Sequence, residues 1–346
     1  MIRTILTAVF ALLLSTATTT ASTPRKGIGC WRTVNARKTA ASRMQQMRVK
    51  TGDRTHFTGK NRGLVILAEF TDKKFKEAIN HKLSGKAADK NGIMVDLNTA
   101  VKVSQQVAKG YGLTIIPGLE ITRANDYGHF NALFTKDNNT IFDPDPVQSA
   151  KNAKAQGALI MHNHPGWRKK DLTPTPTEAT LYAEGLVDGI EVVNGSEFYP
   201  GIIDRAHEYN FFVAANTDVH STTALDYRLL GYDRPMTLVF AKEKTLESVR
   251  EALEARRTLA YGFGAVSGEE QLLKDFFKAS MQVSKVSDKA FMLTNKTSVP
   301  YTLRQEGKNP VALAPFSTIR VEGSGKFVVL NMFCGKERHP EVEFAF

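Results

Sequence analysis

The alternation of short apolar runs with amphipathic segments between residues 95 and 281 constrains the fold more than any other feature of the sequence. The apolar runs have the length and composition of buried strands. The amphipathic segments carry their apolar residues at helical spacing. Strands that alternate with helices in this way are typical of βα units that build a parallel sheet or barrel. We therefore expect an α/β fold over this region.

The expected elements can be placed along the chain by their sequences. The first helix carries Ala100, Val103 and Val107 on one face and ends near Gly110. The strands expected after it are LTIIPG, HFNALF, GALIMHN, GIEVVNG and FFVAANTD, and the expected helices are 147–156, 176–184, 200–209, 246–253 and 269–279. Short strands then alternate closely with turns in AFMLTN, VPYTLRQ, NPVALAPFSTIRVEG and KFVVLNMF. This spacing predicts a small antiparallel β domain at 286–346.

The start of the chain differs in composition from the rest. Residues 1–22 combine an early Arg3 with a short apolar run and a zone of small residues, which is the pattern of a secretory signal peptide. The run is too short to span a bilayer, and no later segment is apolar enough to do so. We therefore expect an exported protein, periplasmic or secreted. Cys30 and Cys334 could pair in an oxidising compartment, and the sequence leaves that question open.

The net charge of +11 comes from one segment, a basic leader at residues 23–92. This leader contains 17 Lys and Arg against 5 Asp and Glu, whereas residues 93–346 contain 28 against 30. A basic leader can bind nucleic acid or a membrane surface, but it is more often a solvated segment, which is the interpretation we favour. The basic excess therefore says nothing about the substrate of the α/β region.

Imidazole and carboxylate groups gather next to the expected strands. Glu120 follows IIPGL, His129 opens HFNALF, and His164 follows a buried apolar run. Asp218 and His220 close FFVAANTDVHS, and residues i and i+2 of a strand point the same way. Such ligands at several strand ends suit Zn, Mn or Fe. A lone histidine is more often structural than a ligand, so the prediction of a divalent metal site depends on the whole group.

Four motifs make the sequence similar to a known family. In chain order the motifs are GLTIIPGLEITRANDYGHFNALF, AKAQGALIMHNHPGW, GLVDGIEVVNGSEFYP and VAANTDVHS. They resemble motifs of the polymerase-and-histidinol-phosphatase (PHP) family, and most closely those of its exported Bacteroidetes-type members. The resemblance covers residues 93–346 and includes a small C-terminal β domain. It implies a distorted (β/α)7 barrel at 93–281 and the hydrolysis of phosphoesters with up to three metal ions.

The metal ligands of the family match positions of this sequence one by one. Glu120 matches the carboxylate that bridges the first two metals, and His129 and His164 match the histidines of the second metal. Asp218 matches a ligand of the first metal and His220 a ligand of the third. The resemblance therefore implies that Asp218 and His220 also take part in catalysis.

Two arginines and one further histidine lie close to these motifs. Arg123 and Arg168 could hold phosphate oxygens through their planar donor groups, although pairing on the surface is an equally good interpretation. His162 is left out of the ligand set because the family match falls on the histidine directly before Pro165.

The resemblance has a gap at its start. The family opens with a strand that ends in H-x-H and a second strand that ends in D-H, and neither motif occurs in residues 1–92. We therefore expect an incomplete barrel in which only the second metal keeps three protein ligands. One interpretation is a phosphoesterase for a small-molecule or nucleotide substrate, impaired by the missing ligands. The alternative is an inactive remnant or binding module, and neither interpretation involves a specific nucleic acid.

Overall fold

The computed structural model describes residues 96–344 except 123–127, 168–170, 219–233 and 324. The expected signal peptide, the basic leader, Arg123, Arg168 and His220 lie outside the described residues. The chain divides into two compact units. Among the described residues, the N-terminal unit holds 96–189 together with Asp218, and the C-terminal unit holds 190–217 and 234–344. Both units combine helices with β-sheet, so the expected α/β class is confirmed.

The N-terminal unit is built around three strands, β1 (Gly118–Thr122), β2 (His129–Leu133) and β3 (Leu159–Asn163). The strands lie side by side in this order, and β2 runs antiparallel to both of its neighbours. The expectation of parallel strands is therefore wrong for β1–β3. Alternating strands and helices do not by themselves fix strand direction, because a connection that contains a helix can also return the chain antiparallel.

The first strand begins later than the sequence predicted. Residues 113–117 of the expected strand LTIIPG have no regular structure, and Leu113 is 59% exposed. The strand starts instead after Pro117, whose missing N–H makes it a poor partner in a sheet. The search for apolar runs misplaced β1 because a charged residue, the buried Glu120, lies in the middle of this strand.

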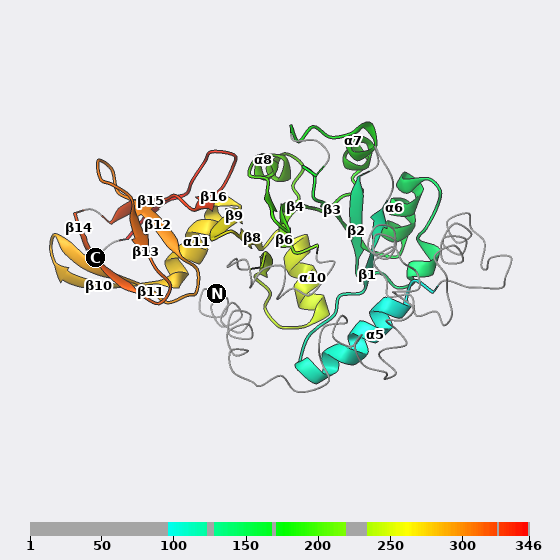
Figure 1. Cartoon of the computed structure of the whole chain (residues 1–346), viewed down its shortest axis with the longest axis horizontal. Coiled ribbons are helices and arrows are strands. Elements are labelled where there is room, and N and C mark those ends of the chain that lie inside the picture. The colour runs from blue at the N-terminus through cyan, green and yellow to red at the C-terminus, as the bar shows by residue number, and fades with distance from the viewer. Residues whose placement is uncertain (1–95, 123–127, 168–170, 219–233, 324, 345–346) are drawn as a thin grey trace, which may run out of the picture. The chain divides into compact units, whose positions relative to one another are not determined.

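The helices of this unit begin at residues whose side chains cap them. α6 (Pro146–Ala155) starts with a proline, and the side chain of Asp145 accepts from the Val147 N–H. α7 (Pro176–Ala183) opens with a reciprocal capping box between Thr175 and Glu178. α6 packs against β1 and β3 (Figure 1). The remaining helical elements are α5 (Thr99–Ala108) and the 3-10 turns η2 (Lys109–Tyr111) and η4 (Asn138–Thr140).

The C-terminal unit begins with strands and helices that the sequence also predicted. They are β4 (Gly189–Asn194), α8 (Gly201–Glu208), β6 (Phe212–Asn216), α10 (Leu246–Glu254) and α11 (Glu270–Ser280). The short strand β5 (Glu197–Phe198) was not predicted. β4 pairs with both β5 and β6. A sheet that the sequence did not predict consists of β7 (Met236–Val239), β8 (Thr258–Gly262), β9 (Ala265–Gly268) and β16 (Met332–Phe333).

The remaining strands of the chain form two antiparallel sheets. One sheet has the order β10-β11-β14 and another the order β13-β12-β15-β17. Their strands are β10 (Met281–Ser287), β11 (Ala290–Asn295), β12 (Tyr301–Arg304), β13 (Val311–Leu313), β14 (Thr318–Glu322), β15 (Lys326–Val329) and β17 (Glu341–Glu343). One hydrophobic core runs from Leu238 to Val342 and includes Phe277, Phe291 and Tyr301. No helix among the described residues is both long and apolar enough to cross a membrane.

Candidate metal centre

Strand register places Glu120 and His129 on one face of the β1–β2–β3 sheet. Glu120 pairs with Asn131, and Thr122 pairs with His129. Residues that face each other across two strands point to the same side, as do residues two apart along a strand. Glu120 and His129 therefore share a face. Because β2 is antiparallel, its first residue lies at the edge of the sheet where β1 and β3 end.

His164 reaches the same face through an unusual backbone conformation. It follows β3 directly, and regular continuation of the strand would place it on the opposite face, together with His162. Its φ of 32° breaks this alternation. A non-glycine residue with a positive φ is uncommon and costs about 1–3 kcal/mol. This conformation turns the imidazole toward β1 and β2.

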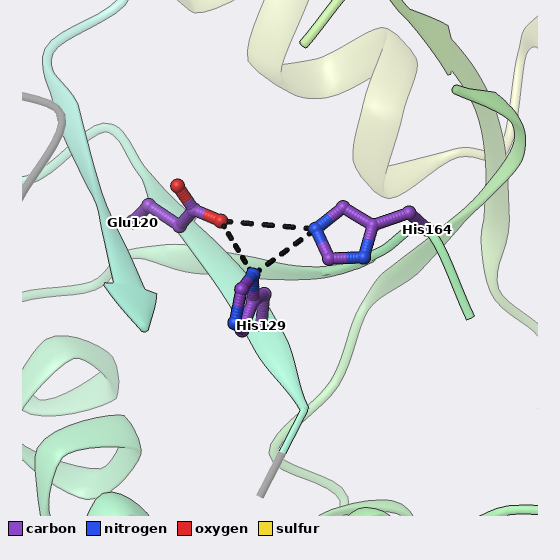
Figure 2. Close-up of side chains that lie close together, drawn as sticks. All are labelled: Glu120, His129 and His164. Atoms are coloured by element: carbon purple, nitrogen blue, oxygen red, sulfur yellow. Dashed lines mark hydrogen bonds and ion pairs between the residues drawn. The ribbon is translucent and has the colours of Figure 1, made fainter. Parts of the chain in front are cut away.

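The three side chains converge on one point, as Figure 2 shows. His129 Nδ1 lies 3.1 Å from His164 Nε2 and 3.2 Å from Glu120 Oε1, and His164 Nε2 lies 3.9 Å from the same carboxylate oxygen. All three side chains are largely buried, with 12% of His129, 7% of His164 and 1% of Glu120 exposed. We call Glu120, His129 and His164 the triad.

The spacing of the triad fits a transition-metal ion. Ligand atoms of a tetrahedral zinc site lie about 3.3 Å apart when each bond is about 2.0 Å long. The nearest point equidistant from the three donor atoms lies about 2.0 Å from each of them, which is a normal Zn–N or Zn–O bond length. Two histidines and one glutamate also form one of the ligand sets of catalytic zinc sites, in which a fourth position stays open.

Two neighbours of the triad were not predicted as part of the site. Asn163, the last residue of β3, places its Nδ2 3.4 Å from Glu120 Oε1. Trp167 is 55% exposed, and its ring lies 5.5 Å from that of His129 and 5.4 Å from that of His164. Both residues occur within the HNHPGW stretch, so their closeness to His164 in sequence was the available signal. A small cavity of about 20 Å³ beside them has room for about one water molecule.

The structure does not place the other predicted site residues in the triad. Asp218 is half-buried and has a φ of 46°, but it does not belong to the group of three among the described residues. His220, Arg123 and Arg168 fall in the parts of the chain that the structure does not describe. His162 lies on the opposite face of β3, where it stacks on Phe130.

A much larger pocket of the N-terminal unit contains none of the three residues of the triad. It measures about 750 Å³ and is lined by residues such as Asp96, Lys102 and Asp137. Its carboxylates already accept hydrogen bonds from within the unit: Asp137 from Asn98 Nδ2 and the Asn139 N–H, and Asp96 from its own set of donors. We therefore assign it a structural role and place the candidate site at the triad.

Comparison with solved structures finds a similar protein. The chain is similar to the crystal structure of a two-domain protein from Bacteroides vulgatus ATCC 8482, described as containing a predicted PHP-like metal-dependent phosphoesterase. The two are 31% identical, the match covers 74% of this chain and 82% of the other, and the TM-score is 0.69. No family model and no curated protein matches the sequence.

Proposed function

Because this chain belongs to the family of PHP-like metal-dependent phosphoesterases, we propose that it hydrolyses a phosphate ester with the help of a divalent metal held by Glu120, His129 and His164. The observation that supports this most directly is the convergence of the three donor atoms within 3.9 Å of one another. Zinc, manganese or iron would suit this set of ligands. When bound, such an ion polarises a phosphoryl oxygen and makes water a nucleophile at neutral pH.

The residues of the triad have separate tasks in this proposal. Glu120 supplies the only negative charge of the group, and this charge offsets part of the charge of a divalent ion in a buried place. His129 and His164 each present one ring nitrogen to the ion, and in such sites the other nitrogen of the ring commonly bonds to a group that orients the imidazole. Trp167 lies beside both rings and would limit the access of water from its side.

A second candidate function is metal binding without turnover. It is favoured by the size of the group, because the described residues bring together three ligands and Asp218 is not among them. Phosphoester hydrolysis in multi-metal sites depends on ions that stabilise both the attacking and the leaving oxygen. With one ion, we expect hydrolysis to be slow, and the protein would then act mainly as a binding module.

The finer features of the sequence analysis belong to the same proposal. We propose that residues 93–281 form an incomplete, distorted PHP barrel and that 286–346 form a small β domain. Asp218 and His220 would add ligands and catalytic groups, and Arg123 and Arg168 would hold phosphate oxygens. The substrate would be a small-molecule or nucleotide phosphoester, and the protein would be exported after removal of residues 1–22.

The experiment measures metal content and hydrolysis on the same samples. The purified chain is loaded with zinc or manganese, dialysed and analysed for bound metal, and then given an aryl phosphate as substrate. We expect about one ion per chain and slow hydrolysis, both lost in His164→Ala. His207→Ala is the matched control, because this histidine is exposed on α8 in the other unit.

Each outcome separates the two candidate functions. Hydrolysis that requires His164 supports the phosphoesterase, whereas stoichiometric metal without hydrolysis supports the binding module. A wild-type chain that retains no more metal than His164→Ala would contradict both.

A further inference from the structure

A cluster of buried polar side chains lies in the N-terminal unit, on the side of the sheet opposite to the triad. It consists of His162, Glu178 and Tyr182, which are 1%, 7% and 4% exposed. His162 comes from the face of β3 that points away from the triad, and the other two come from α7. Three polar side chains are rarely buried together unless they are bonded to one another. We call these residues the Glu178 cluster.

The cluster is bonded through both ring nitrogens of His162. The Tyr182 hydroxyl bonds to Nδ1, and Glu178 Oε1 lies 3.3 Å from Nε2. The second carboxylate oxygen of Glu178 accepts from the Thr175 N–H at 2.8 Å, as part of the capping box of α7. The Glu178 carboxylate is therefore fixed from two sides, by the start of a helix and by a strand.

The cluster contacts the residues on both sides of His129. Phe130, directly after His129, stacks on His162 with ring centroids 4.7 Å apart and planes at 23°. Gly128, directly before it, lies so close to Glu178 that a Cβ there would be 2.6 Å from Oε1. Gly128 also has a φ of 71°, so the residue directly before β2 has a left-handed backbone conformation. The backbone that carries His129 is held at both neighbouring positions.

From these contacts we infer that the Glu178 cluster is a positioning device for His129, and that it sets the metal affinity of the triad without touching the ion. The inference rests on the proposed function, because it assigns the metal to the triad. His129 Nδ1 takes part in the two shortest separations of the triad, 3.1 Å and 3.2 Å. A displacement of this ring therefore changes the two donor separations that are nearest to those of a zinc site. Groups that orient a ligand commonly change metal affinity about 10–100-fold.

The sharpest test is a pair of glycine variants. Gly128→Ala and Gly185→Ala both place a methyl group on a backbone with positive φ, 71° and 65°, in the same unit. An alanine at Gly185 meets nothing within 4 Å, whereas at Gly128 it pushes against the fixed carboxylate of Glu178. The two variants carry comparable backbone strain, so a difference between them reports the contact. We expect Gly128→Ala to weaken zinc binding at least about tenfold more than Gly185→Ala in competition with a chromophoric chelator.

A second pair tests Glu178 itself. Glu178→Ala removes the link between α7 and His162 and should weaken zinc binding to a similar degree. Glu178→Gln keeps an oxygen for the Thr175 N–H and a side chain of the same length, so it should recover most of the affinity. A purely structural role would leave zinc affinity unchanged in every variant that folds, as judged by circular dichroism.

A measurement without metal keeps this inference separate from the proposed function. Histidine-selective NMR on the metal-free chain, with His129 assigned through His129→Asn, should show its ring signals shifted in Gly128→Ala and unshifted in Gly185→Ala. If the wild-type chain binds no zinc while these shifts occur, the positioning holds and the metal assignment is wrong. Equal zinc affinities and equal ring signals in the two glycine variants would overturn the positioning role.

Discussion

His129 Nδ1 and His164 Nε2 lie 3.1 Å apart, although the two residues stand 35 positions apart in the chain. An ion that binds both nitrogens needs a lone pair from each of them, so the proton of each neutral ring must then sit on its other nitrogen. The 3.1 Å separation is close to that of two ligands of one zinc ion, so both rings can offer their lone pairs to the same ion.

Loss of the Glu120 charge should abolish tight metal binding. Glu120→Gln keeps the shape of the side chain but leaves a divalent ion in a buried site with two neutral ligands. We expect zinc affinity to fall at least about 100-fold, since groups that only orient ligands already account for about 10–100-fold. Competition with a chromophoric chelator measures the change. Glu184→Gln, which alters an exposed partner of Lys151, should bind zinc as the wild type does.

Removal of metal should lower the thermal stability of the chain. A ligand that binds only the folded state at about 100 times its Kd stabilises it by about 2.7 kcal/mol. Thermal unfolding is followed with zinc and after treatment with a chelator, and Tm should fall on chelation. In His164→Ala the two Tm values should coincide; a chelator effect of the same size in that variant would place the metal elsewhere.

Trp167 should report metal binding through its fluorescence. Its ring lies 5.5 Å from the ring of His129 and 5.4 Å from that of His164, close enough for a paramagnetic ion bound there to quench the indole. The chain contains two tryptophans, so Trp31→Phe leaves Trp167 as the only one. We expect saturable quenching of this variant by Cu²⁺ or Co²⁺. Quenching that survives His129→Ala would show that the ions bind away from the triad.

Protonation of Asp96 at low pH should lower the stability of the N-terminal unit. Burial acts to raise the pKa of this carboxyl, but bonds from Asn139, Asn98, Lys102 and Thr99 together outweigh it and lower the pKa to about 2. Because the folded pKa lies below the unfolded one, the stabilisation is present above about pH 4 and is lost as the pH falls toward about 2. Asp96 is partly exposed, so we expect the loss to be only about 1 kcal/mol.

Denaturant unfolding of the wild type and Asp96→Asn between about pH 2 and pH 6 measures this effect. The two proteins should differ most at the upper end of this range and converge at the lower end. A difference that stays constant over the range would mean that the carboxylate charge has no part in it.

The sequence predicted elements best where hydrophobic periodicity and caps agreed. α6 and α7 lie within one residue of their predicted bounds, and in the structure Pro146 and Pro176 begin them and capping side chains fix their first turns. β3 was legible as a run of apolar residues that becomes fully buried. β1 was misplaced because Glu120, a polar residue kept inside a strand, breaks the apolar pattern.

The geometry of the site could not be read from the sequence. Nothing in the order of strands shows that β2 is antiparallel, and this direction is what brings His129 to the ends of β1 and β3. The positive φ of His164 is equally invisible, because it depends on packing around a non-glycine residue. His162 was set aside as a ligand on the basis of resemblance alone, and its bonds to Glu178 and Tyr182 appear only in three dimensions.

His129 pairs with Thr122 on one side and with Asn163 on the other, so the triad can form only when β2 has folded in the correct register. A slip of β2 by one residue would turn Phe130 toward Glu120 and bury the imidazole of His129 against the wrong layer. A chain with such a slip could still be compact and rich in β structure, yet it would capture no ion. The amount of zinc bound during refolding would therefore measure the fraction of molecules in which β2 has the correct register with β1 and β3.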